Sequence, residues 1–207
     1  MAGRNVREML KRYGSTRGNY FSLKDHGDKA QVRLLYDHPE GEDLDYYVIH
    51  DLNAGKEGTF SDYVLCPEDS CPLCESGVNK ARLMVFMQLL DFRDNKLKVF
   101  VRNDKYLQKL LAIIERYGPL VERPFEIERV GRKGDTKTTY EFFHFDKDGK
   151  TLKDFPPRID MLNKDNGGLI RKLTTQQLLT ASSPQDDLPP EPAPTRTKSD
   201  TEEDPFF

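Results

Sequence analysis

Three cysteines lie within nine residues of this chain, at Cys66, Cys71 and Cys74, and it has no others. An odd number at this spacing does not make a disulfide framework. A Cys-x2-Cys pair lets two thiolates meet one ion through a tight turn, and Cys66 supplies a third sulfur. The alternative, three small buried hydrophobic side chains, fits poorly with polar neighbours such as Glu68 and Asp69. The cluster therefore predicts a metal site, with zinc as the natural ion.

Structural zinc takes four ligands, and a histidine is the obvious fourth. His50 ends an apolar run upstream of the cysteines, whereas His26 and His38 lie in loop sequence and His144 in a distant hairpin. The competing interpretation of His50 is a strand histidine with one ordinary hydrogen bond. Three thiolates and one imidazole would leave no position for a catalytic water. We expect one structural Zn2+ in a subdomain of about residues 50–77, held by His50, Cys66, Cys71 and Cys74.

The motifs of common enzymes are missing from the sequence. The Pro-Cys-x-x-Cys element of nucleotide deaminases has a superficial match in Cys71-Pro72-Leu73-Cys74, but those enzymes also need His-x-Glu, and His50 is followed here by Asp51-Leu52. No Gly-x-Ser-x-Gly, Walker-type phosphate loop or His-Glu-x-x-His occurs. We expect a protein that is not an enzyme.

Charge divides the chain into three parts. Residues 1–18 hold five basic residues against Glu8, whereas residues 186–207 hold seven acidic residues against Arg196 and Lys198. The tail is also rich in proline and poor in large apolar residues, so we expect it to be disordered. The sequence predicts a basic arm (1–18), a core (19–180) and an acidic tail (181–207). Chance composition competes with a partner-binding role for the tip, which comprises Asp204, Pro205, Phe206 and Phe207.

The core is rich in predicted strands, at residues 30–36, 46–50, 82–92, 96–102, 124–129 and 137–145. One helix is well signalled: Asn103 can cap it, Leu107, Leu110, Leu111 and Ile114 follow helical spacing, and Gly118-Pro119 ends it. Shorter helices are predicted at 6–13 and 175–179. This pattern favours a mainly β protein, an OB-fold-like Greek-key barrel with an inserted zinc-binding subdomain.

Alternation along two neighbouring strands predicts a face of rings and cations. Rings stack on unpaired bases and cations neutralise phosphates, although an ordinary solvated face with protective lysines is the competing interpretation. Phe143 and Phe145 are expected to pack inside. The DNA contacts that we expect are Tyr46, Tyr63, Arg82, Phe86, Lys96, Lys98, Phe100, Arg102, Arg132, Lys133 and Tyr140.

These features together resemble the zinc-containing single-stranded DNA-binding proteins of tailed bacteriophages, of the T-even helix-destabilising type. The resemblance covers the whole chain at motif level. It implies an OB-fold core with the His-Cys-Cys-Cys zinc site and an acidic tail that binds replication and recombination proteins. It also implies a basic arm for cooperative self-association, here through Arg4, Arg7, Lys11 and Arg12. The Phe-Phe tip looks like that of bacterial single-stranded DNA-binding proteins.

The expected function is to coat single-stranded DNA, whatever its sequence, in phage DNA replication, recombination and repair. No uncharged apolar run exceeds the eight residues 83–90, so we expect no membrane span and a location in the cytoplasm of the host cell. Two alternatives are a zinc-bearing adaptor or transcription regulator that binds protein or duplex DNA, and a metal-dependent nuclease.

Overall fold

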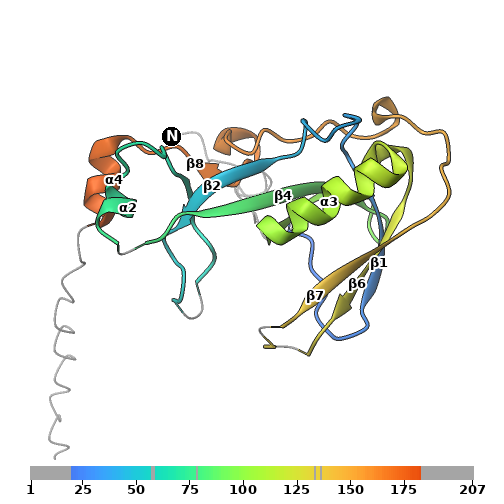
Figure 1. The fold of residues 1–207 in the computed structure, drawn as a ribbon, viewed down its shortest axis with the longest axis horizontal. Helices are drawn as coiled ribbons and strands as arrows, with labels where there is room; N and C mark the ends of the chain where they lie inside the picture. Colours follow the sequence, from blue (N-terminus) through green and yellow to red (C-terminus); the bar gives the residue numbers. More distant parts are fainter. Residues whose placement is uncertain (1–19, 57–58, 78, 133, 136, 183–207) are drawn as a thin grey trace, which may run out of the picture.

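The computed structural model describes residues 20–56, 59–77, 79–132, 134–135 and 137–182 (Figure 1). The predictions for the arm, for Lys133 and for the tail tip therefore lie outside the described residues. No helix in the described ranges has the length and apolar character needed to cross a membrane.

The chain is mixed α/β and mostly β, and one large open mixed sheet organises it. The strands are β1 (Lys29–Leu34), β2 (Tyr46–Asp51), β3 (Tyr63–Leu65), β4 (Arg82–Asp91), β5 (Lys96–Asn103), β6 (Phe125–Val130), β7 (Thr139–His144) and β8 (Ile170–Arg171). The helices are α2 (Pro72–Glu75), α3 (Asp104–Tyr117) and α4 (Thr175–Ser182), with 3-10 turns at Leu120–Glu122, Leu152–Asp154 and Lys164–Asn166. The well-signalled helix is confirmed as α3, which begins directly after Asn103 and ends before Gly118.

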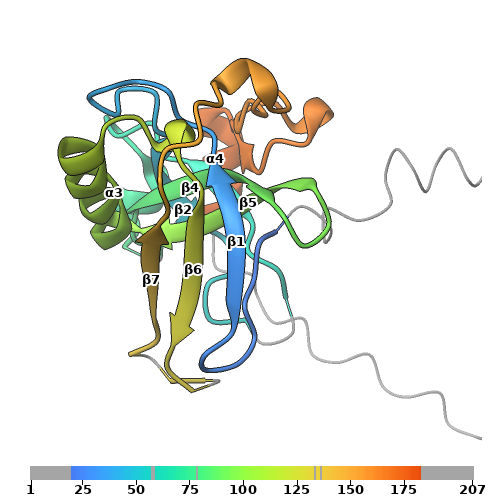
Figure 2. The ribbon, with the colours of Figure 1, turned by 90° about the vertical axis from the view of Figure 1, so that its right-hand side faces the viewer.

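Strand β4 is the centre of the sheet, whose order is β7-β6-β1-β4-β2-β3-β8, with β5 paired to the other edge of β4. Its first half pairs with β2 and its last three residues pair with β1. All pairs are antiparallel except β3 with β8. Figure 2 shows β1, β6 and β7 side by side, with α3 next to them. Among the described residues no pairing joins β5 to β7, so the predicted closed barrel is not seen.

Both faces of β4 are covered. Val85, Met87 and Leu89 pack under α3, together with Phe100 of β5. On the opposite face Phe86 packs with side chains from the segment that returns after β7, including Met161. The run from Val85 to Leu89 is consequently buried at every position.

Two of the predicted DNA contacts are corrected by this arrangement. Phe86 and Phe100 have no exposed surface, although both were expected on one solvent face. The register pairs Phe86 with Val101 and Met87 with Phe100, which puts the two rings on opposite faces of the sheet. Each face is covered, so neither ring can stack on a base.

Candidate metal centre and nucleic-acid cleft

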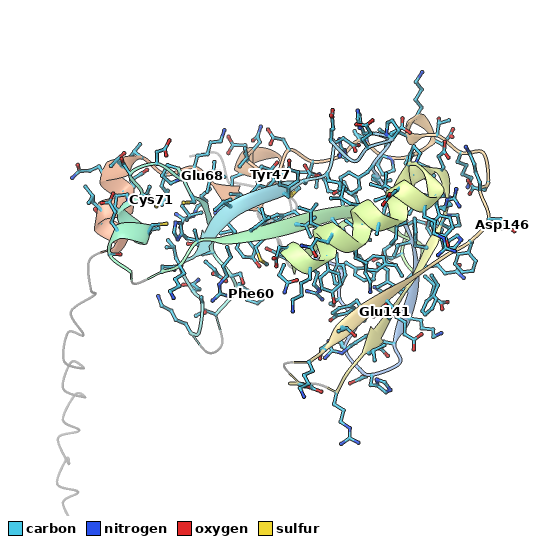
Figure 3. All side chains as sticks on the ribbon, viewed as in Figure 1. Tyr47, Phe60, Glu68, Cys71, Glu141 and Asp146 are labelled. Atoms are coloured by element: carbon cyan, nitrogen blue, oxygen red, sulfur yellow. The ribbon has the colours of Figure 1, made fainter. Side chains whose placement is uncertain are left out.

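The four predicted ligands come together, and Figure 3 shows one of them, Cys71, at one end of the sheet. His50 lies in β2, Cys66 follows β3, Cys71 precedes α2 and Cys74 lies within it. Their ligand atoms all lie within 4.8 Å of one another. Among the described residues, this is the one group of three or more potential metal ligands whose ligand atoms lie so close together.

The spacing of these atoms fits zinc. Tetrahedral zinc, with bonds of about 2.3 Å to sulfur and about 2.0 Å to nitrogen, sets S–S distances of about 3.8 Å and S–N distances of about 3.5 Å. The Sγ atoms of Cys66 and Cys74 are 3.8 Å apart. The Nε2 of His50 lies 3.3 Å from Cys71 Sγ and 3.7 Å from Cys74 Sγ. The donor set of one imidazole and three sulfurs is that of a closed structural site.

The surroundings orient the ligands for a metal. His50 Nδ1 lies 2.9 Å from the Asn79 carbonyl oxygen, and an N–H donated there leaves Nε2 free to bind an ion. The amide N–H of Glu68 donates to Cys66 Sγ at 3.4 Å. Burial, together with the neighbouring Cys71 and Cys74, raises the pKa of the Cys66 thiol to about 12. A bound cation would supply the charge that keeps these sulfurs as thiolates.

The metal module has its own small core. Leu73 of α2 and Leu178 of α4 are buried together with Val64, Cys66 and Cys71. Strand β8 adds to β3, the strand that leads into Cys66. The module predicted at about residues 50–77 therefore also includes β8 and α4, which come from the end of the core.

A cleft lies beside this module, made of two hollows that share Val101 and Arg102. The larger has a volume of about 770 Å3, and its charged and aromatic lining is Arg82, Arg102, Asp104, Tyr106, Arg129, Asp135 and Tyr140. The smaller, of about 410 Å3, is lined by Tyr20, Phe21, Thr59, Phe60, Ser61 and Tyr63 besides the shared pair. Figure 3 shows Phe60 on the side of the β2–β3 loop that faces the β6–β7 hairpin.

The three arginines of the larger hollow have no carboxylate partner in the part of the chain that the structure describes. Among the described residues no Asp or Glu oxygen lies within 4.0 Å of the guanidinium nitrogens of Arg82, Arg102 or Arg129. Of the two aspartates in the lining, Asp135 accepts the amide N–H of Lys137 at 2.8 Å. The larger hollow thus keeps an excess of positive charge.

Arg102 is held in place by aromatic rings. Its guanidinium carbon lies 3.9 Å from the ring centre of Phe100 and 4.2 Å from that of Tyr140. Nη1 donates to the Val101 carbonyl at 2.7 Å, while the buried Nε has no acceptor among the described residues. Burial lowers the pKa of Arg102, although an arginine remains charged at neutral pH. Arg129 is oriented in a similar way, because its Nη1 donates to the Tyr140 hydroxyl at 2.8 Å.

The other predicted DNA contacts have mixed outcomes. Tyr63 and Tyr140 line the hollows, but they are 9% and 6% exposed rather than open to solvent, because each packs edge-on against a buried phenylalanine. Tyr46, Lys96 and Arg132 are exposed and lie outside both hollows. Lys98 is bound by Asp91 and Asp94 at 2.8 Å each, so its charge is neutralised.

Two further predictions about aromatic side chains are wrong. Phe143 and Phe145 were expected to pack inside, but they are 49% and 40% exposed. Phe143 lies opposite Glu126 in the register of β6 and β7, on the face that carries Lys29, and Phe145 follows the end of β7.

Sequence reasoning did not select Tyr20, Tyr106 or Arg129 as site residues. Arg129 follows Glu126 and Glu128 in β6, but by strand alternation it shares the face of the buried Phe125 and Ile127, and that inward position is the signal the sequence offers for it. The sequence signal for Tyr20 is an aromatic residue placed two positions after the predicted basic arm.

Comparison of the chain with protein-family models, with curated proteins and with solved structures finds no match.

Proposed function

We propose that the protein binds single-stranded DNA without sequence preference, as a phage-type protein of DNA replication, recombination and repair. The observation that carries the proposal is the cleft, in which three arginines stand among tyrosine and phenylalanine rings and have no carboxylate partner within the described ranges. A polyanion with exposed bases needs both, since cations neutralise phosphates and rings stack on bases. Each stacked base contributes about 1–3 kcal/mol whatever its identity.

The order of the strands supports the same proposal. Strands β5, β4, β1, β6 and β7 are paired in that sequence, and α3 connects β5 to β6. This is the arrangement expected of an OB-fold opened between its third and fifth strands. OB-folds bind oligonucleotides on the face of strands 2 and 3, between the loops that join strands 1 to 2 and 4 to 5. The equivalent parts here are β4–β5, the segment containing the metal module, and the β6–β7 hairpin, and all three line the cleft.

The mechanism follows from these positions. Arg82, Arg102 and Arg129 would hold the phosphates, with Arg102 kept rigid between two rings. Phe60, the exposed ring of the smaller hollow, would receive a base. When bound, zinc supplies a cross-link between the strands that begin and end the β2–β3 loop, so that the loop stays at the cleft. The protein binds and releases its strand and carries out no chemistry on it.

Partner recruitment by the acidic tail and its Phe-Phe tip belongs to the same proposal, as does self-association through the arm. The two segments carry opposite charges, since the tail is acidic and the arm basic. The tail also offers a competing polyanion for the cleft.

Fluorescence titration of the full chain with poly-dT and with duplex DNA of equal length tests the proposal. We expect tighter binding to poly-dT, and an affinity that falls with salt, with a log-log slope of about -0.7 for each phosphate contacted. Preference for duplex would favour the adaptor or regulator instead. Cleavage of the strand with added magnesium would favour the nuclease, and an affinity independent of salt would contradict the electrostatic argument.

A further inference from the structure

Strands β5 and β7 stand at opposite ends of the paired series β5-β4-β1-β6-β7, and in the described chain they do not pair with each other. Tyr140 of β7 nevertheless contacts β5, because its ring packs edge-on against that of Phe100 with 4.9 Å between the ring centres. Helix α3 fixes the backbone of Tyr140. Its amide N–H donates to the Tyr106 hydroxyl and its carbonyl accepts from Lys109 Nζ, each at 2.9 Å. Side-chain contacts of Tyr140 thus join two strands that backbone hydrogen bonds leave apart.

Tyr140 also contacts two of the three arginines of the larger hollow, with a different part of its side chain for each. The guanidinium carbon of Arg102 lies over the ring, 4.2 Å from the ring centre. The hydroxyl accepts a hydrogen bond from Arg129 Nη1 at 2.8 Å, and the register places Arg129 directly opposite Tyr140 on β6. Arg102 belongs to β5 and Arg129 to β6, so one tyrosine orients positive charges from two strands.

The two guanidinium groups are oriented and yet remain available to an anion. Within the described chain no carboxylate oxygen lies within 4.0 Å of the nitrogens of either group. Both arginines line the larger hollow. A side chain that is already ordered loses less conformational entropy on binding than a free one does. The contacts of Tyr140 should therefore raise the affinity for an anion without adding charge.

The position of Tyr140 leaves little room for the base-stacking role expected from the sequence. The side chain is 6% exposed, with Arg102 over its ring and Phe100 packed edge-on against it. A base needs an open ring face. The contacts that Tyr140 does make are with the groups that would bind phosphates.

We propose that Tyr140 is a positioning residue for phosphate binding, whose ring orients Arg102 and whose hydroxyl orients Arg129, so that charges from β5 and β6 act as one unit. The inference rests on the proposed function, because the phosphate backbone of a single strand is the anion that the two arginines would bind.

Tyr140→Phe tests the hydroxyl, since it keeps the ring. In the full chain we expect it to weaken poly-dT binding about threefold to tenfold, the range expected when one side chain must be ordered on binding. In an Arg129→Met background, which has no guanidinium to orient, the same substitution should change the affinity less than about twofold. A loss of equal size in both backgrounds would overturn the positioning of Arg129.

Tyr63→Phe is the matched control for this cycle. It removes a hydroxyl from the smaller hollow, which Arg129 does not line, so its effect should be the same with and without the arginine. Arg129→Met alone should weaken poly-dT binding and reduce its dependence on salt. If Arg129→Met bound like wild type, the inference would fail, since an arginine without a phosphate contact needs no orientation.

Tyr140→Leu tests the ring. It releases Arg102 as well as Arg129, so we expect a larger loss than in Tyr140→Phe, of about tenfold or more, and part of that loss should disappear in an Arg102→Met background. If Tyr140→Phe binds like wild type, and Tyr140→Leu loses the same affinity with and without Arg102, the ring serves packing or base stacking and the proposal is wrong. Melting temperatures of the same samples show which variants are folded, and the Tyr140→Phe cycle alone decides if Tyr140→Leu does not fold.

The wild type in the same titrations keeps this inference apart from the proposed function. If wild type does not bind poly-dT, the proposed function fails and the inference fails with it. If wild type binds and Arg129→Met weakens binding, while the loss caused by Tyr140→Phe is the same in both backgrounds, only the positioning role fails.

Discussion

The two ends of the β4–β5 hairpin differ in whether their positively charged side chains are paired with acids in the described chain. At the turn, Asp91 has no exposed surface and binds Arg93 at 2.6 Å and Lys98 at 2.8 Å. At the open end, Arg82 and Arg102 line the larger hollow. Within the described chain no carboxylate oxygen lies within 4.0 Å of the guanidinium nitrogens of either arginine. The turn carries its own acids, Asp91 and Asp94, while the open end carries none that reach its arginines. Cations at one end therefore stabilise the fold, and those at the other remain available to an anion.

This contrast changes how a basic strand is interpreted. Lys98 and Arg102 lie on one strand with the same alternation, and sequence alone treats them alike. Of these two, Arg102 is the one with no carboxylate partner among the described residues, and its neighbours are the rings of Phe100 and Tyr140. An anion site is therefore better sought at cationic side chains that have no acidic partner than in the region with the most cationic side chains.

Removing the metal should disturb the open end far more than the turn. In Cys71→Ser we expect loss of one zinc per chain and a large fall in stability, since structural zinc contributes on the order of 10 kcal/mol of apparent binding free energy in small modules. Metal analysis and hydrogen exchange check this, with protection lost first around residues 50–77 and 170–182. Glu68→Gln, at an exposed neighbour, is the control and should keep the metal. A variant that kept both its zinc and its melting temperature would contradict the assignment.

Asp91→Asn should disturb the turn and spare the cleft. It leaves Arg93 and Lys98 without their buried carboxylate, which should cost about 3 kcal/mol of unfolding free energy at pH 7. Affinity for single-stranded DNA should stay within about twofold of wild type. Denaturant unfolding and DNA titration on the same samples measure both. A large loss of DNA affinity in a folded variant would mean that the two ends are not separate.

The same aspartate predicts a dependence on acid. Burial raises the pKa of Asp91, but hydrogen bonds from Arg93 and Lys98 outweigh it and lower the pKa to about 2 from an ordinary value of 3.8. A depressed carboxyl pKa adds stability that is complete above about pH 4 and is lost as the pH falls toward 2. The wild-type advantage over Asp91→Asn should therefore shrink between pH 4 and pH 2. An advantage that stayed constant through this range would contradict the ion pairs.

Phe60→Ala should give the smallest of these effects, because it removes one stacking ring. The side chain is 62% exposed, so little stability should be lost. Loss of one stacked base should weaken poly-dT binding by about 1–3 kcal/mol. Phe143→Ala is the matched control, since Phe143 is 49% exposed but lies outside both hollows. Equal effects of the two substitutions would remove Phe60 from the site.

The sequence predicts what depends on local chemistry. The spacing of three cysteines and the end of a strand at His50 are enough to select the four side chains that come together, and the spacing of Leu110 and Ile114 is enough to select α3. Whether Phe86 and Phe100 are exposed depends instead on the strand register and on side chains, distant in the sequence, that cover each face of the sheet. The turn pairs Asp91 with Lys96, which places the two rings on opposite faces, and Met161 covers one of those faces from 75 residues further along. No local pattern signals either fact.

The salt dependence of poly-dT binding tests the central claim most directly. The variant Arg82→Gln/Arg102→Gln/Arg129→Gln is compared with Lys96→Gln/Arg116→Gln/Lys164→Gln, which removes equal charge from outside the two hollows of the cleft. We predict that the cleft variant loses about two units of log-log slope and at least tenfold in affinity, while the control stays close to wild type. Equal slopes for the two variants would contradict a cleft in which arginines without carboxylate partners bind the strand.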